Sequence, residues 1–266
     1  MLIVGERINS SHKMMAQAME ARDVTFIQKE AVMQVESGAN YIDVNAGAFL
    51  AEESEVLKWL VEVVQQVTTQ PLCIDTPDPD AAAAALRLIR GKAMINSITA
   101  EKERFAAFLP LLKAYDCDVV ALCVDGSRVP TTAEEKLEIA SGIIQSLNQE
   151  GIAPERIYVD PVVQPLSVDP TSAMAVLSAI EMIGAQFPEV HRICGVSNIS
   201  FGLPSRRQLN RNFMVLAMQR GLDAAIIDPC DEQLMANIIT TNTLLGGDEY
   251  CLSYIKAYRE GKLAER

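Results

Sequence analysis

Carboxylate and carboxamide side chains close a series of apolar, β-type segments along this chain of 266 residues. Carboxylates accept hydrogen bonds and carboxamides both accept and donate them, so together they suit a planar ligand that presents several N–H donors on one edge. The segment ends carry, in chain order, Glu6 and Asn9, Asp43 and Asn45, Asp75, Asn96, Asp125, Asp160, Ser197 and Asn198, and Asp228.

The same segment ends supply neither lysine nor histidine, which excludes several kinds of chemistry. A Schiff-base aldolase needs a lysine, and a metallohydrolase needs clustered histidines. Enzymes of sugar phosphates usually place glycine-rich turns at such ends, whereas the last segment here closes in Asp-Pro-Cys-Asp-Glu, which would repel phosphate. His12 and His191 show no metal-ligand or catalytic spacing, and the six cysteines form no C-x-x-C pair. We therefore predict no metal site in this chain.

Short β-rich segments alternate strictly with segments of helical periodicity. We predict strands over residues 2–9, 41–47, 71–76, 92–98, 118–126, 157–163, 192–200 and 224–230, and helices over 11–38, 52–67, 78–90, 101–115, 132–150, 170–185, 206–220 and 231–245. The strands are nearly continuous apolar runs, which is typical of parallel strands buried on both faces. Eight such repeats in about 250 residues predict an α/β protein with one domain, residues 1–266, folded as a single (β/α)8 TIM barrel.

In such a barrel the carboxyl ends of all strands meet at one mouth, so the polar residues that close the strands should form one site. Asp75, Asn96 and Asp160 could each cap a helix or shape a turn, but the three together favour a ligand site. Four further residues could line that site or pair with one another: Glu6, Asp43, Asn45 and Asp125.

The run ICGVSNISFG, residues 193–202, is the most informative stretch. It is typical of a buried strand that ends in small polar residues, and Asn198 alone could serve only to cap its own backbone. Because other strands also end in Asp or Asn, Asn198 is our first candidate for a functional residue. Arg206 and Arg207 follow this run and could neutralise an anionic ligand tail or cap local carboxylates.

Composition narrows the classes of partner. The chain has 23 basic and 35 acidic residues, a formal charge of −12, and no Lys/Arg-rich stripe, so nucleic acid is not an expected partner. No apolar segment approaches the ~20 residues that span a bilayer, and MLIVGERINS is unlike a signal sequence. We therefore expect no membrane partner and a cytoplasmic location.

Seven segments carry a resemblance to a known family: GERIN, YIDVNAG, LCIDT, KAMINSI, YVDP, GVSNISFG and DPCDE, in this order and spacing. From Leu2 to about Tyr258 the chain resembles a methyltetrahydrofolate:corrinoid protein methyltransferase, and it is similar to the folate domain of cobalamin-dependent methionine synthase. The G-V-S-N-I-S pattern is rather specific to this branch, whereas the third-strand Asp, the fourth-strand Asn and the Asp-Pro pair are shared with dihydropteroate synthases. The 2-amino-4-oxo pterin of these proteins' ligands has the N–H-rich edge inferred above.

The resemblance implies roles for individual residues. Asp75, Asn96 and Asp160 would hold the amino-pyrimidinone edge of the pterin, and Asn198 would reach N5, the nitrogen that carries the methyl group. Gly195 and Ser197 would line the same wall, and Arg206 corresponds to a family arginine. The loop 201–205 departs from the acetogen-type loop of the family, so Arg206 and Arg207 both stay candidates for the ligand.

The resemblance also implies the reaction and the partners. A methyl group would move between N5 of tetrahydrofolate or 5-methyltetrahydrofolate and the cobalt of a corrinoid (cobalamin). The chain has no D-x-H-x-x-G pattern with which to bind that corrinoid itself, so a separate corrinoid protein would bring it as a transient partner. The family implies a homodimer. The direction of transfer, and which corrinoid protein takes part, stay open.

Three other functions are alternatives to methyl transfer. A dihydropteroate synthase would need a lysine in the seventh strand, where this chain has Ser197-Asn198. A pterin-binding subunit without catalysis would keep the acceptor set, and a sugar-phosphate isomerase would rest on fold analogy alone.

Overall fold

A parallel eight-stranded barrel forms the centre of the computed structural model, which describes residues 1–126 and 129–263. The strands are β1 (Leu2–Asn9), β2 (Tyr41–Asn45), β3 (Leu72–Asp75), β4 (Ala93–Ile98), β5 (Cys117–Leu122), β6 (Ile157–Asp160), β7 (His191–Arg192) and β8 (Ala224–Ile227). They are ordered β7-β6-β5-β4-β3-β2-β1-β8. The ring closes beyond the short β7, where Ile226 N–H donates to the Cys194 carbonyl at 3.0 Å. The predicted (β/α)8 barrel is confirmed.

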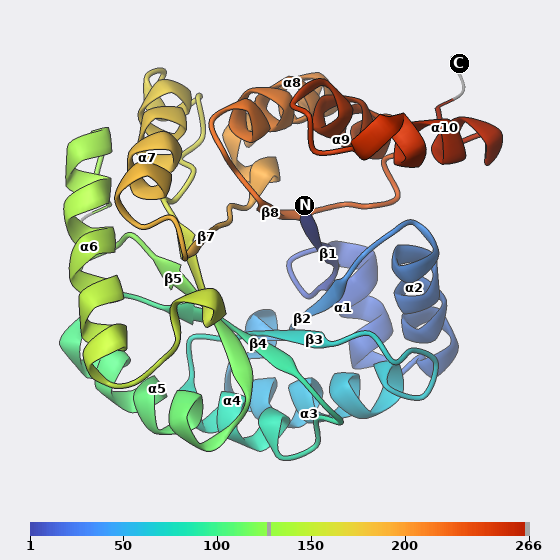
Figure 1. Ribbon diagram of the computed structural model, residues 1–266. Helices are drawn as coiled ribbons and strands as arrows, with labels where there is room; N and C mark the ends of the chain where they lie inside the picture. Colours follow the sequence, from blue (N-terminus) through green and yellow to red (C-terminus); the bar gives the residue numbers. More distant parts are fainter. Residues whose placement is uncertain (127–128, 264–266) are drawn as a thin grey trace.

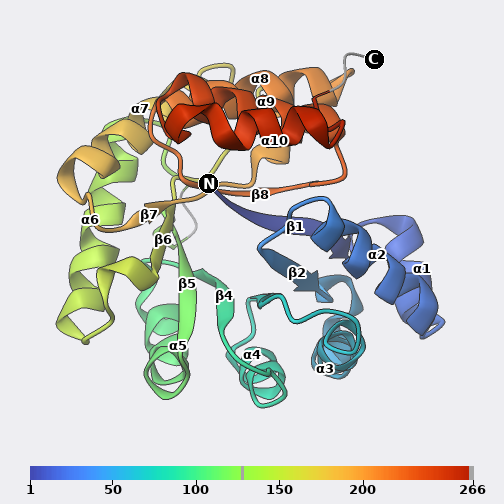
Figure 2. The same ribbon diagram turned by 45° about the vertical axis from the view of Figure 1, so that its right-hand side comes forward.

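Helices surround the strands (Figure 1). They are α1 (Lys13–Glu20), α2 (Val24–Glu36), α3 (Glu53–Val64), α4 (Pro79–Leu86), α5 (Lys102–Ala114), α6 (Ala133–Gln149), α7 (Ser172–Gln186), α8 (Arg206–Gln219), α9 (Glu232–Leu244) and α10 (Leu252–Arg259), with 3₁₀ turns η1 (Gly47–Glu52), η2 (Pro154–Arg156), η3 (Val196–Ser200) and η4 (Glu249–Cys251). Figure 2 shows α8, α9 and α10 together on one flank, with α3, α4 and α5 across the barrel from them. Within the described residues, no helix is both long and apolar enough to cross a membrane.

Side-chain caps start several of these helices where the sequence predicts a start. Thr132 accepts from Glu135 N–H while the Glu135 side chain accepts from Thr132 N–H, a capping box that fixes the first turn of α6. Asp78 accepts from Asp80 N–H at 2.9 Å and precedes Pro79, a residue suited to the first helical position.

An apolar layer fills the barrel below its mouth. One buried or largely buried residue from each strand, or from the segment beside it, contributes: Val4, Tyr41, Cys73, Met94, Val120, Tyr158, Ile193 and Ala224. A larger apolar cluster lies between the strands and the outer helices. The interior is therefore a packed core, and only the strand ends above this layer can hold a ligand.

Two elements differ from the sequence-based prediction. Residues 11–38 form two helices, because Asp23 accepts from Phe26 N–H and starts α2 afresh. The predicted strand 192–200 was wrong beyond Arg192: residues Val196–Ser200 form η3. The β-branched content of this run suggested a strand. Val196 and Ile199, however, stand three positions apart and are buried in one apolar cluster with Phe213 of α8, which suits one face of a 3₁₀ turn.

Candidate functional site

The ends of β2, β3 and β4 bring four polar side chains together, three of them at one level and the fourth, Asp43, two residues earlier on β2. Asn45 pairs with Asp75, and Asp75 with Asn96, in the strand register. The Asn45 amide donates to Asp75 Oδ2 at 3.0 Å, and the Asn96 amide lies 3.5 Å from Asp43 Oδ1. This wall, Asp43, Asn45, Asp75 and Asn96, joins four of the predicted site residues.

The two carboxylates of this wall have raised pKa values. Burial raises the pKa of Asp75 to about 6, with a further contribution from the Glu53 carboxylate, while the bond from Asn45 opposes the rise. Asp43 is 1 % exposed, and burial followed by the nearby Asp75 holds its pKa well above the usual range. Carboxylates that are poorly compensated by the protein favour a ligand that brings N–H donors.

Asp160, at the end of β6, lies in the adjoining part of the mouth. Its Oδ1 accepts from Val162 N–H at 2.7 Å, and its carboxylate also accepts from the backbone N–H of Gly195. Burial raises the pKa of Asp160 to about 6, while these two bonds and the charge of Lys136 oppose the rise. Through Gly195, Asp160 is connected directly to the segment that carries Asn198.

Glu6 and Ser197 join the β1 end to η3. The Ser197 hydroxyl donates to Glu6 Oε1 at 2.6 Å. Burial raises the pKa of Glu6 to about 7, Asp228 adds to the rise, and the Ser197 bond and Arg206 oppose it. Glu6 thus changes its charge near neutral pH, in contact with the segment proposed from the sequence to meet the ligand.

Asn198 lies exposed in the middle of η3, with its amide folded over Gly195. A Cβ built on Gly195 would stand 3.0 Å from Asn198 Nδ2, closer than side chains ordinarily pack. Gly195 has φ −75° and ψ 91°, which other residues also adopt. A glycine therefore suits position 195 because the Asn198 amide occupies the space of a side chain, and not because of the backbone conformation.

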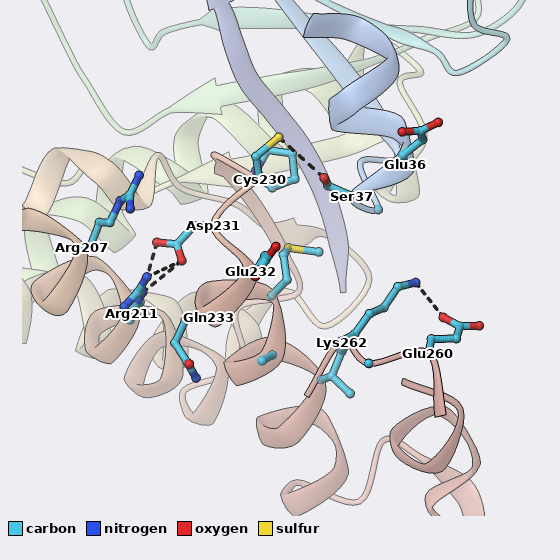
Figure 3. A pocket seen from close by; sticks show the side chains of 16 residues that line it. Glu36, Ser37, Arg207, Arg211, Cys230, Asp231, Glu232, Gln233, Glu260 and Lys262 are labelled. Atoms are coloured by element: carbon cyan, nitrogen blue, oxygen red, sulfur yellow. Dashed lines mark hydrogen bonds and ion pairs between the residues drawn. The ribbon is translucent and has the colours of Figure 1, made fainter. Parts of the chain in front are cut away.

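The two candidate arginines point to different places. Arg206 donates to the Ser197 carbonyl at 2.8 Å and to Ser200 Oγ at 3.1 Å, and its guanidinium stacks over the Phe201 ring at 5.5 Å. Arg207 instead lines a lateral cavity of about 740 Å³ between α2, α8, α9 and the C-terminal segment. Figure 3 shows it near Arg211 and Asp231, which form an ion pair. Arg206 is thus the arginine that contacts η3.

Two of the remaining candidates border the main groups: Asn9 pairs with Asn45 in the register of β1 and β2, and the charge of Asp228 acts on Glu6. Asp125 follows β5 and is exposed. Asn9 accepts from Ser11 N–H at 2.9 Å and shapes the turn after β1. Asp228 pairs with Arg7 at 3.1 Å and accepts from Cys230 N–H, so it stabilises the loop that begins at the end of β8.

Sequence reasoning missed two cations that lie close behind the site. Arg104 of α5 donates to the Ser97 carbonyl at 2.8 Å, and its charge acts on Asp75. Lys136 of α6 is only 1 % exposed and lies near Asp160. A signal for Lys136 was present, because it occupies a position on the apolar face formed by Ala133, Ala140 and Ile144. Within residues 1–126 and 129–263 there is no group of His, Cys, Asp or Glu side chains that could hold a metal ion.

Comparison with known proteins agrees with this geometry. A family model described as "Pterin binding enzyme" matches residues 5–228. The chain is 38% identical to methylcorrinoid:tetrahydrofolate methyltransferase of Eubacterium limosum, over 99% of this chain and 98% of that protein. It is 29% identical to methionine synthase of Mycobacterium tuberculosis, over 85% of this chain but only 20% of that longer protein.

Solved structures share the fold. A dihydropteroate synthase of Xanthomonas albilineans superposes with a TM-score of 0.70 at 18% identity, covering 92% of each chain. A dihydropteroate synthase of Coxiella burnetii gives a TM-score of 0.67 at 15% identity, covering 91% of this chain and 94% of the other.

The barrel and its acceptor-lined mouth define a pterin-binding barrel, and with the match over residues 5–228 the chain belongs to the pterin-binding enzyme family. Within that family it is a homologue of methylcorrinoid:tetrahydrofolate methyltransferase, so the resemblance inferred from the sequence motifs is confirmed.

Proposed function

We propose that this protein moves a methyl group between N5 of tetrahydrofolate, or of 5-methyltetrahydrofolate, and the cobalt of a corrinoid carried on a separate protein. The observation that carries the proposal is the meeting of two groups at one mouth: the partly buried Asp75 and Asn96 with the buried Asp160, and the exposed Asn198 amide folded over Gly195. The full-length similarity to the Eubacterium limosum enzyme supports the same reaction.

The first of these groups would bind the part of the pterin that does not react. Asp75 and Asp160 accept hydrogen bonds from the amino-pyrimidinone edge, and the Asn96 carboxamide can both donate and accept there. Charge-assisted bonds of this kind each contribute roughly 1.5–3 kcal/mol. Asp43 and Asn45 act behind this edge, because they bond Asn96 and Asp75 respectively.

Asn198 would act at the reacting nitrogen. A tertiary amine is a poor leaving group, so N5 needs a proton or a strong hydrogen bond as its bond to the transferred methyl group breaks. The carboxamide of Asn198 is no acid, but it can stay bonded to N5 while charge develops, which is worth ~3–4 kcal/mol for one well-placed contact. In the opposite direction the same contact orients the N5 lone pair.

Gly195, Ser197 and Arg206 would hold this catalytic segment in place. Gly195 leaves room for the amide, Ser197 ties η3 to Glu6, and Arg206 bonds the Ser197 carbonyl. Arg206 is therefore the better choice of the two arginines for a ligand-side role. Asp125 and Arg207 contribute less to the proposed site, because Asp125 is exposed after β5 and Arg207 lines the lateral cavity.

The loops around the mouth suit a transient protein partner that presents the corrinoid. Four connections that follow strands each carry one exposed apolar side chain: Met14 (71 %) at the start of α1, Leu50 (80 %) in η1, Val168 (73 %) between β6 and α7 and Phe201 (64 %) after η3. The connections of Met14 and Leu50 are joined by the Ser10 hydroxyl, which accepts from Ala48 N–H, and those of Val168 and Phe201 by Ser167, which donates to the Phe201 carbonyl. One apolar pair thus follows β1 and β2, and the other follows β6 and β7. Exposed apolar residues rimmed by polar ones favour protein contacts.

The proposal extends to the whole chain, residues 1–266 as one domain, working as a homodimer in the cytoplasm. The family resemblance supports these three points, and sedimentation of the purified protein tests the homodimer.

Mixing the protein with methyltetrahydrofolate and free cob(I)alamin tests the reaction. The Co(I) absorbance should bleach at a rate that depends on the protein. Unchanged absorbance, with tetrahydrofolate binding intact in calorimetry, would instead support a pterin-binding subunit without catalysis. Assays against candidate corrinoid proteins, in both directions, then decide the direction of transfer.

A further inference from the structure

Lys136 of α6 is a buried cation behind the β6 end. It is 1 % exposed, and its ammonium donates to the carbonyls of Pro161 at 2.7 Å and Val162 at 3.1 Å. A buried ammonium is strongly unfavourable unless it is hydrogen-bonded, so a lysine is an unexpected choice for a contact that only joins a helix to a loop.

One peptide group connects this ammonium to Asp160. The Pro161 carbonyl, which accepts from Lys136, belongs to the same peptide unit as the Val162 N–H, which donates to Asp160 Oδ1 at 2.7 Å. A hydrogen bond to the carbonyl polarises the peptide and strengthens its N–H as a donor. The cation and the carboxylate are thus coupled through one peptide.

We propose that Lys136 is a positioning residue for the pterin site: through the Pro161–Val162 peptide it keeps the Asp160 carboxylate ionised and oriented. The role in pterin binding rests on the function proposed above. The coupling between Lys136 and Asp160 is a property of the protein without ligand.

The backbone of Val162 shows how firmly the loop is held. Val162 has φ 57°, in the left-handed region that a β-branched residue rarely adopts. Its N–H is bound by Asp160 and its carbonyl by Lys136. The two side chains of the coupled pair therefore hold both ends of an otherwise unfavourable residue.

The other titratable groups near the pair are neutral or negative, so Lys136 is the cation that acts on Asp160. They are Cys123 after β5, Cys194 after β7, Asp169 in the β6–α7 loop and Glu135 on α6. Burial raises the pKa of both thiols well above neutrality, so they stay uncharged at physiological pH. Asp169 and Glu135 are negative and cannot replace the lysine.

Carboxyl ¹³C NMR of Lys136→Met tests the coupling without ligand, with Asp160→Asn to assign the signal. Methionine fills the space of the lysine stem but carries no charge. Without the cation, the Asp160 titration midpoint should rise by about one pH unit above the wild-type value, the size expected for a nearby opposite charge. A midpoint equal to that of the wild type would overturn the inference.

Tetrahydrofolate affinity measured from pH 5 to 8.5 gives a second readout. Lys136→Met should bind about tenfold more weakly at pH 5, about twofold more weakly at pH 7 and nearly as well as the wild type at pH 8.5, where Asp160 is ionised in both proteins. A loss that is equal at every pH would mean that the lysine only supports the fold. If the wild type binds no tetrahydrofolate, the proposed function fails, while the NMR titration still decides the coupling.

Two further variants serve as controls. Lys136→Met/Val162→Gly keeps the peptide groups but removes the unfavourable φ of valine, so it should fold even if the single variant does not, and it should show the same raised midpoint. Leu147→Ala, in the buried face of α6, should lower the melting temperature and leave the Asp160 midpoint unchanged. If Leu147→Ala raised the midpoint as much as the lysine variant, general loosening of α6 would explain both.

Discussion

The two walls of the mouth are built differently. One wall stands on β2, β3 and β4, where the strand ladder fixes the backbones of Asn45, Asp75 and Asn96 at one level and that of Asp43 two residues earlier. Asn198 stands on the single turn of η3 and is exposed, with its position set by contacts of Gly195, Ser197 and Arg206. A rigid wall suits the pterin edge, which stays the same through the reaction. A wall made of one short turn leaves the reacting atom open to the partner.

Both walls hold carboxylates whose pKa values burial has raised. In the strand wall, burial holds the pKa values of Asp43 and Asp75 above their ordinary range, so charge there is unfavourable until a donor arrives. Around η3, burial raises the pKa of Glu6 to about 7, although the Ser197 hydroxyl and the charge of Arg206 oppose the rise. The comparison predicts that changes in the strand wall act on binding and stability, and changes in η3 act on the rate.

Asn198→Ala should have the largest effect of all. Loss of one contact that strengthens as charge develops costs about 3–4 kcal/mol in the barrier, a fall of about 10²–10³ in the rate of methyl transfer. Stopped-flow absorbance of the corrinoid measures it, and tetrahydrofolate affinity should change much less. Asn212→Ala, an exposed asparagine of α8 that bonds the Gln208 carbonyl, is the matched control. A transfer rate within threefold of the wild type would remove Asn198 from the mechanism.

Asp75→Asn should separate binding from stability. Replacing the carboxylate by a carboxamide removes a charge-assisted bond to the pterin and should weaken tetrahydrofolate binding by about 10- to 100-fold, as calorimetry would report. The same change removes a buried charge beside Asp43 and should raise the melting temperature at pH 7.5, by roughly 2–4 °C for each kcal/mol gained.

The pH dependence of that stability has a definite sign. The folded pKa of Asp75 is raised to about 6. Its contribution to stability is therefore complete below its unfolded pKa and is lost as the pH rises through about 6. The advantage of Asp75→Asn should accordingly vanish near pH 4. Asp80→Asn, an exposed position in the first turn of α4, should raise the melting temperature at neither pH. A melting temperature of Asp75→Asn below the wild type at pH 7.5 would contradict this account.

Gly195→Ala should lower the rate of methyl transfer by about 3- to 10-fold, because the new Cβ displaces the Asn198 amide by a few tenths of an ångström. The backbone angles of Gly195 accept alanine, so the melting temperature should stay near that of the wild type. Gly142→Ala is the matched control, since a Cβ there meets nothing within 4 Å inside α6. That variant should keep full activity and gain up to about 1 kcal/mol in stability. Equal rates for the two variants would show that Gly195 does not limit Asn198.

How far the sequence predicts this molecule depends on how local each signal is. The barrel, and the meeting of Asn45, Asp75 and Asn96, follow from strand ends that share one register. The 3₁₀ turn η3 could not be predicted from the sequence. Its β-branched residues favour a strand, whereas their burial in the folded protein favours a 3₁₀ turn. Lys136 stands out in the sequence only by its position on the apolar face of α6, and its acceptors, backbone carbonyls 25 and 26 positions away, cannot be recognised from residue types.

Ser197→Ala should have the smallest effect, and it tests the charge of Glu6 beside η3. The Ser197 hydroxyl donates to Glu6 at 2.6 Å and favours the ionised carboxylate, whose pKa burial has already raised to about 7. Loss of the bond raises that pKa further, so any limb of the pH–rate profile that reports Glu6 must move to higher pH, while the rate well above that limb stays the same. Glu6→Gln should remove the limb altogether. A profile that keeps its limb in Glu6→Gln would assign the titration to another group, and Asp75 of the strand wall and Asp160 at the end of β6, whose pKa values burial raises to about 6, would be the candidates.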